Sequence, residues 1–270
     1  MLKQYKPTLD KLTKIVGKSH VLIDEQDTRH YRQGIRFGEG KVLAVVCPGT
    51  LLEQWQALQT IIEADCVVIM QAANTGLTGG STPYGDDYDR PVIIMSTRRL
   101  QGIQVILDGK QVVCLPGATL DNLERTLKPY NREPHSVIGS SCIGASVLGG
   151  VCNNSGGALV RRGPAYTEMA LYARVNESGE LELINHLGID LGNTAEEILT
   201  RLQKQDYEMG QITTQTTQLA SDNRYAHDVK QVDADSPARF NADPTRLYEA
   251  SGSAGKVCVF AVRLDTFEKV

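Results

Sequence analysis

Two uninterrupted apolar runs, at residues 42–47 and 66–70, lie on either side of a segment with a helical pattern. The first run, VLAVVC, lacks the alternation of a half-exposed strand and predicts a strand that is covered on both faces, and CVVIM predicts a second apolar strand. Between them, Thr50 and Glu53 have the spacing of a capping box. Six apolar side chains then form one helical stripe: Leu51, Leu52, Trp55, Leu58, Ile61 and Ile62. This order predicts a βαβ unit with parallel strands, and PVIIMS at 91–96 adds a third strand.

The pattern changes after residue 100, because the predicted strands now come in pairs joined by tight turns. GIQVIL and QVVCL flank Asp108-Gly109, and ALYARV and ELELIN flank residues 176–179. Both are hairpin signatures, and a hairpin pairs its strands antiparallel. We therefore expect a small α/β subdomain over 1–100 and a second, α+β subdomain over 101–270.

Helices are expected at four further places. An amphipathic pattern covers residues 8–17, a Thr-capped helix begins after 119, and a capping box opens another at 194. NADPTRLYEASG, at 241–252, predicts a short helix with Asp as its cap and Pro in its first turn. Residues 203–235 are polar and rich in Gln and Thr, so we expect a surface excursion or disorder there.

The composition is that of a soluble globular protein and not of a nucleic-acid or membrane-surface binder. The formal net charge is -4 and the longest basic runs are pairs such as Arg161-Arg162, whereas phosphate contacts need clustered Lys and Arg. No segment approaches the roughly 18 consecutive apolar residues of a membrane span, and the N-terminus lacks the apolar core of a secretory signal. We expect a cytoplasmic protein, or one that docks on a membrane through something not in this chain.

Metal and disulfide chemistry are not predicted. The cysteines are scattered without a C-x-x-C pair, and most lie in or beside apolar runs, which indicates small core residues: Cys47, Cys66, Cys114, Cys142, Cys152 and Cys258. In YGDDYDRP, Asp86, Asp87 and Asp89 follow a Gly turn and are interpreted as solvated carboxylates, not as ligands of a divalent ion.

The first candidate site is the loop IMQAANTGLTGGSTP at 69–83, which carries no charged side chain. It follows a predicted parallel strand and therefore lies at the carboxyl end of a sheet, where open α/β folds bind ligands. Glycines 76, 79 and 80 are expected to adopt positive φ and to gather backbone N–H groups around an anion. Neither common nucleotide loop fits, because the P-loop Lys is absent and the order G-x-x-G-G is not a Rossmann fingerprint.

A second uncharged cluster, VIGSSCIGASVLGGVCNNSGG at 137–157, is again rich in Gly, Ser and Asn. Two such loops favour a ligand large enough to contact both of them, such as a dinucleotide whose diphosphate is held by backbone dipoles. The alternative is that the glycines only permit tight turns and close packing. Ser140, Ser141 and Ser146 also allow an amidase-like serine hydrolase, although Lys110 and Lys128 fall in a hairpin turn and at a helix end.

AANTGLTGGSTP, REPHSVIGSSCIGASVLGGVCNNSGG and RGPAYTE together resemble the FAD-binding domain of the respiratory, quinone-dependent D-lactate dehydrogenases, which are p-cresol-methylhydroxylase-type flavoproteins. The similarity extends from YRQGIRFGEG near the start to the segment PARFNADPTRLYEASGSAGKVCVFAVRLDTF. The resemblance implies an α+β fold, with a small parallel α/β subdomain followed by a mostly antiparallel sheet flanked by helices. It also implies that FAD lies between the two parts.

The resemblance further implies which residues contact the flavin cofactor. In the first loop they are Ala72, Ala73, Asn74, Thr75, Gly76, Gly80 and Ser81. In the second cluster and the last strand they are Gly139, Ser146, Gly156 and Val259. Some relatives tether their flavin through a loop His, which is missing here, so we expect FAD to bind non-covalently. No catalytic residue is assigned.

The chain departs from the family in stopping at Val270, directly after an apolar strand, where family members continue into a substrate-binding cap and a membrane-contacting segment. We therefore expect a chain cut at a domain boundary. The resemblance implies D-lactate or a related D-2-hydroxy acid as substrate, a quinone as electron acceptor, and a peripheral location on the cytoplasmic side of the inner membrane. Membrane contact would come only from regions absent here, so this chain alone would be soluble. A stand-alone flavin-binding module without catalysis stays open.

Three charged or titratable residues border the second cluster. His135 is the histidine nearest the expected flavin, and a structural role is favoured over that of a base. Arg161 and Arg162 are long enough to reach a phosphate or a substrate carboxylate, but surface solvation is the default expectation.

Overall fold

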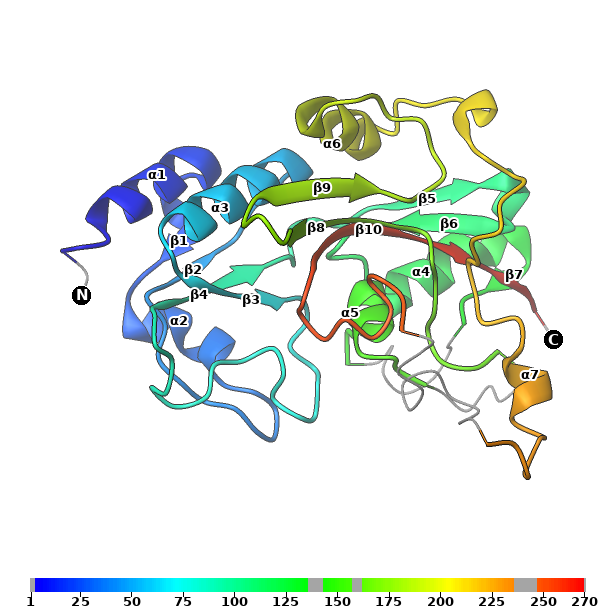
Figure 1. Ribbon diagram of the computed structural model, residues 1–270, viewed down its shortest axis with the longest axis horizontal. Helices are drawn as coiled ribbons and strands as arrows, with labels where there is room; N and C mark the ends of the chain where they lie inside the picture. The colour runs from blue at the N-terminus through cyan, green and yellow to red at the C-terminus, as the bar shows by residue number, and fades with distance from the viewer. Residues whose placement is uncertain (1–2, 136–142, 157–161, 236–246, 270) are drawn as a thin grey trace. The chain divides into compact units, whose positions relative to one another are not determined.

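A computed structural model provides the structure of residues 3–135, 143–156, 162–235 and 247–269 (Figure 1). The chain divides into two compact units, Met1–Leu100 and Gln101–Val270, and each is described by itself. Within the residues just given, no helix is both long enough and apolar enough to cross a membrane.

The first unit contains a four-stranded sheet in the order β1-β2-β4-β3. Its strands are β1 (Val21–Leu22), β2 (Ala44–Val46), β3 (Val67–Gln71) and β4 (Val92–Ser96). Both β2 and β3 pair parallel to β4, which confirms the predicted parallel strands, and β1 pairs antiparallel to β2. Because β4 lies between β2 and β3, β3 is at an edge and most of its residues are only half-buried. The strand predicted to be covered on both faces, β2, is buried along its whole length.

The helices of the first unit are α1 (Lys6–Val16), the short 3-10 helix η1 (Lys18–His20), α2 (Glu25–Arg32) and α3 (Leu51–Glu63). Thr50 caps α3 as predicted, because its hydroxyl accepts a hydrogen bond from the Glu53 N–H at 3.1 Å. The Glu53 carboxylate accepts from the N–H of Gly49 at 2.6 Å and not from that of Thr50. The capping box therefore reaches one residue further back than predicted, and it fixes the turn between β2 and α3.

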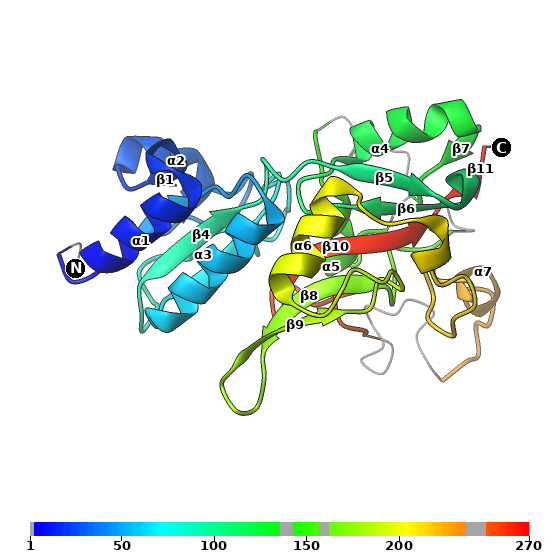
Figure 2. The same ribbon diagram turned by 90° about the horizontal axis from the view of Figure 1, so that it is seen from above.

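The second unit is built on a five-stranded antiparallel sheet in the order β5-β6-β10-β8-β9 (Figure 2). Its strands are β5 (Ile103–Ile106), β6 (Gln111–Cys114), β8 (Ala170–Val175), β9 (Leu181–Asn185) and β10 (Cys258–Asp265). The pairs β5–β6 and β8–β9 confirm the two predicted hairpins. The strand from the end of the chain, β10, occupies the centre between them. A separate two-stranded pair joins β7 (Arg132–Glu133) to β11 (Phe267–Glu268).

Helices cover both faces of the second sheet. The helices of this unit are α4 (Leu120–Leu127), α5 (Val147–Cys152), α6 (Ala195–Lys204) and α7 (Tyr225–Asp228), with 3-10 helices η2 (Leu107–Gly109), η3 (Lys128–Tyr130) and η4 (Met209–Gln211). Figure 1 shows α4 and α5 on one side of the strands and α6 on the other. The apolar faces of α4 and α5 join side chains of β6, β8 and β10 in one continuous core. This packing sets α5 against the middle of the sheet.

The remaining predictions of local structure were partly correct. Thr119 and Thr194 cap α4 and α6, each accepting a hydrogen bond at 3.2 Å from an N–H of the first turn. Residues 203–235 run over the surface with few buried side chains, as predicted. Of the helix predicted over 241–252, the part up to residue 246 lies outside the described residues. The described part is not helical, because Tyr248 and Ser251 exchange backbone hydrogen bonds across a tight turn.

The buried side chain of Arg263, on β10, makes hydrogen bonds to two loops of the second unit, at residues 187–188 and at Thr213. Arg263 is only 1% exposed. It donates hydrogen bonds to the side-chain oxygen of Gln111 at 2.7 Å and to the carbonyls of Leu187, Gly188 and Thr213 at 3.0, 3.2 and 3.0 Å. Burial lowers the pKa of this guanidinium, while the nearby Asp265 opposes that shift. Neutral oxygens of the protein therefore replace most of the water that would otherwise solvate this charge.

Candidate cofactor-binding site

The first glycine loop, residues 72–83, begins where β3 ends, at the carboxyl end of the parallel strands. Gln71 is buried, and its side-chain amide donates to the carbonyls of Tyr31 and Ser81 at 2.8 and 2.7 Å. Asn74 donates to the carbonyl of Gln33 at 2.8 Å and accepts from the Ser81 hydroxyl at 2.9 Å. Two of the residues expected to contact FAD through side chains, Asn74 and Ser81, thus hold the loop itself in shape.

The backbone of this loop is what remains available to a ligand. Within the described parts of the chain, no N–H group of residues 73–81 donates to a protein acceptor. Several of these residues are half-buried, so their N–H groups need water or a ligand as partner. A row of such donors without a cation suits an anionic group such as a diphosphate.

The glycines of the first loop differ from the prediction. Of Gly76, Gly79 and Gly80, only Gly79 adopts positive φ, at 73°, and Asn74 is a second left-handed residue, at 54°. A Cβ atom on Gly79 would lie 2.9 Å from the carbonyl oxygen of Phe37, so this glycine permits the first loop to pack closely against the segment that contains Phe37. A Cβ atom on Gly76 would meet nothing within 4 Å. Gly76 therefore borders open space, and its expected left-handed conformation was wrong.

The second cluster is described in part, since Gly139, Ser140 and Ser141 lie outside the described residues. Ser146 is buried and caps α5, where its hydroxyl accepts from the Gly149 N–H at 3.0 Å. Gly156 is exposed after this helix. Val259 is buried on β10 and pairs with Tyr172 of β8. Ser146 and Val259 meet in the same part of the unit, because α5 packs against β10.

Buried side-chain oxygens without a hydrogen-bond partner among the described residues gather beside α5. They are Asn154 Oδ1, Glu249 Oε2 and Ser253 Oγ. All three come from two segments, 151–154 and 249–254, that are joined by backbone hydrogen bonds of 3.1 and 3.0 Å. An unpaired buried polar atom costs about 1–3 kcal/mol, so such a concentration fits the place of a polar ligand. FAD, with its hydroxyls and amide-like groups, is a ligand that these residues fit.

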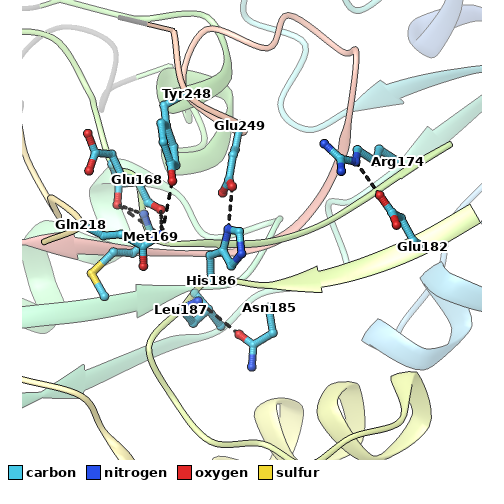
Figure 3. A network of polar contacts seen from close by, with 11 residues as sticks. Glu168, Met169, Arg174, Glu182, Asn185, His186, Leu187, Gln218, Tyr248 and Glu249 are labelled. Atoms are coloured by element: carbon cyan, nitrogen blue, oxygen red, sulfur yellow. Dashed lines mark hydrogen bonds and ion pairs between the residues drawn. The ribbon is translucent and has the colours of Figure 1, made fainter. Parts of the chain in front are cut away.

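Glu249 belongs to a polar network on the sheet side of the same turn (Figure 3). It adopts φ of 48°, and its Oε1 lies 2.5 Å from Nδ1 of His186, directly after β9. Burial raises the pKa of the Tyr172 phenol, and the charge of Glu249 raises it further. No pattern in the sequence pointed to Glu249 or Ser253, whereas Asn154 stood in the second cluster.

The charged residues near this cluster are engaged within the unit. Arg162 donates to the Pro134 carbonyl and to Glu133, both at 2.8 Å, and lies over the Phe267 ring at 4.9 Å. It is therefore neither solvated at the surface nor directed to a phosphate. His135 is buried, and burial together with Arg162 lowers its pKa to about 4, which agrees with a neutral structural histidine. Arg161 lies outside the described residues.

Neither a metal site nor a serine nucleophile gains support from the structure. Asp86 pairs with Lys41 and Asp89 with Arg90, and the described residues contain no group of three side chains that could hold a metal ion. Ser146, the one described serine of the hydrolase hypothesis, is a buried helix cap and is not poised as a nucleophile. The described cysteines are free thiols, all buried except Cys152, which is half-buried.

The fold and this donor-rich, cation-free loop define an α+β domain for a nucleotide-containing cofactor. The profile of the family described as FAD binding domain matches residues 42–182, and the chain belongs to this family. Over 259 residues it is 63% identical to a quinone-dependent D-lactate dehydrogenase of Haemophilus influenzae, covering 96% of this chain and 46% of that protein. The quinone-dependent D-lactate dehydrogenase of Escherichia coli is 58% identical over 263 residues, with 97% and 46% covered. The chain thus spans about half the length of these curated relatives.

Two solved structures are similar in fold. An alkyldihydroxyacetonephosphate synthase superposes with a TM-score of 0.63 at 12% identity, covering 98% of this chain and 41% of that one. A p-cresol methylhydroxylase with bound substrate gives a TM-score of 0.55 at 13% identity, covering 99% and 44%. The predicted fold class, α+β of p-cresol-methylhydroxylase type, is confirmed, and so is the family resemblance. The hypotheses of an amidase-like hydrolase and of a stand-alone module find no support among these relatives.

Proposed function

We propose that the chain is the FAD-binding part of a quinone-dependent D-lactate dehydrogenase and that it binds FAD non-covalently. The observation that carries this proposal is the 63% identity to a protein of that name over 96% of the chain. The matched region covers 96% of the chain and therefore includes most of both units. Non-covalent binding is supported by the first loop, 72–83, which contains neither His nor Cys as an attachment point.

The first loop would hold the diphosphate of FAD through its backbone. The contributing residues are Ala72, Ala73, Asn74, Thr75, Gly76, Gly80 and Ser81, whose N–H groups lack protein acceptors in the described chain from residue 73 onward. Further contacts are proposed for Gly139, Ser146, Gly156 and Val259. When bound, FAD supplies the electron acceptor, and the chain supplies orientation and electrostatics. Neutral N–H donors leave the charge of the diphosphate paired with dipoles only, which favours reversible binding.

The substrate and the electron acceptor are proposed from the relatives. D-lactate, or a related D-2-hydroxy acid, would be oxidised to pyruvate, and the electrons would pass to a membrane quinone. The relatives are about twice as long as this chain, so the base and the carboxylate-binding cations are proposed to lie in the part that the match does not cover. Contact with the cytoplasmic side of the inner membrane is assigned to the same part.

Titration of the purified chain with FAD tests the cofactor assignment. Binding should quench flavin fluorescence and raise the melting temperature, and prolonged dialysis against flavin-free buffer should remove the flavin. Absence of any change in fluorescence or melting temperature would refute the assignment. Flavin that stays attached after unfolding in guanidinium would refute non-covalent binding alone. Anaerobic bleaching of the bound flavin by D-lactate but not by L-lactate would assign the substrate to this chain itself.

A further inference from the structure

We infer that Asn154 and Ser253 together bind a sugar hydroxyl of FAD, either on the ribityl chain or on the adenosine ribose. This inference rests on the proposed function, because it takes FAD as the ligand. It assigns to the cofactor two side chains that lie outside the loop and strand positions proposed above.

The two side chains are buried, and their backbone segments are joined by hydrogen bonds. Asn154 is 6% exposed and Ser253 8% exposed. The amide of Asn154 packs on Gly252, where an added Cβ atom would lie 2.7 Å from Nδ2 and 3.2 Å from Oδ1. Gly252 has φ of 71°, and Ser253 is the next residue in the chain. The glycine thus leaves room for the Asn154 amide directly beside the backbone that leads into Ser253.

Neither Asn154 Oδ1 nor Ser253 Oγ has a hydrogen-bond partner among the described residues. Burial dominates the pKa of the Cys152 thiol and raises it to about 11, although the Ser253 hydroxyl lies beside this thiol and the contact lowers the pKa. Cys152 therefore stays a thiol, which is a weak hydrogen-bond acceptor. Both oxygens carry the cost of burial without a compensating bond, and a ligand that supplied the bond would recover that cost on binding.

The chemistry of the pair selects a hydroxyl over a phosphate. Asn154 Oδ1 can only accept, so its partner must carry a donor hydrogen, which a phosphate dianion lacks. A hydroxyl both donates and accepts, so it matches an amide in either orientation and a Ser side chain at the same time. The carboxylate of Glu249, in the same turn, further disfavours a phosphate and is itself a common partner of ribose hydroxyls. In FAD these requirements are met by the ribityl chain and by the adenosine ribose.

Binding measurements on Asn154→Gly and Ser253→Ala test the inference. Glycine is the replacement at position 154 because Asn154 has a φ of 50°, a conformation that glycine adopts freely and alanine disfavours. Each variant should weaken FAD binding about tenfold, which corresponds to about 1.4 kcal/mol and to the loss of one ligand hydrogen bond. Each should also leave the melting temperature of the FAD-free chain nearly unchanged, because the removed oxygen has no hydrogen-bond partner there. Matched controls are Asn193→Gly and Ser178→Ala, whose side chains are exposed and lie outside segments 151–154 and 249–254. These controls should bind FAD as the wild type does.

The two sources of the hydroxyl are separated by fragments of the cofactor. A loss of affinity for FMN but not for ADP assigns the pair to the ribityl chain, and a loss for ADP but not for FMN assigns it to the ribose. Wild-type FAD affinity in both variants would overturn the inference, as would an equal loss of stability in the FAD-free chain. Failure of the proposed function looks different, because the wild-type chain itself would then show no binding of FAD.

Discussion

The buried Arg263 offers the sharpest test of how the second unit is held together. Its guanidinium reaches four neutral oxygens, three of them backbone carbonyls that no substitution at this position can remove. Arg263→Met keeps an unbranched apolar stem of similar reach and deletes only the donors. The variant therefore isolates the hydrogen bonds that tie two surface loops to β10.

The size of the effect follows from three of the four oxygens, because the Gly188 carbonyl still accepts from the Thr213 N–H at 2.8 Å. Each buried oxygen left without a donor costs about 1 kcal/mol or more, and the gain from no longer burying a charge offsets part of the total. We expect the free energy of unfolding to fall by about 3–5 kcal/mol, as for other buried charges whose partners are left behind. Arg174→Met is the matched control, because the Arg174–Glu182 pair is largely exposed and should be worth about 0–1 kcal/mol.

Urea denaturation followed by circular dichroism measures both variants. The midpoint of Arg263→Met should shift strongly with the same dependence on urea as the wild type, so that the change reports stability and not compactness. A shift for Arg263→Met no larger than that for Arg174→Met would refute the reasoning. It would mean that water or loop movement satisfies the three oxygens once the guanidinium is gone.

Three further predictions concern other parts of the chain. The folded state holds the pKa of His135 at about 4, below its ordinary 6.5, so the unfolded chain binds the proton first as the pH falls. The contribution of His135 to stability should be full above pH 6.5 and fall by about 3 kcal/mol as the pH drops to 4. In urea titrations, His135→Gln should remove this part of the pH dependence. Gly76→Val should weaken FAD binding, measured by fluorescence titration, by filling the open space beside the loop, while it changes stability by less than about 0.5 kcal/mol; an unchanged FAD affinity would remove this loop position from the site. Thr119→Ala should cost about 1 kcal/mol in thermal unfolding through the lost cap of α4, and no measurable cost would contradict the capping role.

Local patterns predicted the elements of the fold well because they report on neighbours in sequence. The hairpin around Asp108-Gly109 and the cap at Thr119 each depend on only a few adjacent residues. The edge position of β3 depends on β4, which follows it by some twenty residues, so an apolar run alone could not reveal it. The turn at 248–251 likewise depends on backbone pairing that a helix-like composition conceals.

The candidate site, too, could be predicted from the sequence only in part. The glycine loop at 72–81 could be found from residue types, because small uncharged residues after a strand are visible in the sequence. The resemblance to flavoproteins then named the cofactor. Asn154 and Ser253 could not be assigned in advance, because their distinguishing property is a missing hydrogen-bond partner and that property exists only in the folded chain. Arg263 posed the same difficulty, since a charged residue in a strand ordinarily indicates a solvent-facing position.

The central place of β10 has a consequence for the order in which the second unit folds. Its two neighbours, β6 and β8, touch each other only through it, although they are made long before it during synthesis. Until residues 258–265 arrive, the chain holds two separate hairpins, and isolated hairpins are marginally stable in water. Closing the sheet then brings together segments far apart in sequence, which is a slow step in folding. The pairing of β10 therefore commits this unit to its native structure. Before that step, the two hairpins have unpaired edges to which other chains can bind.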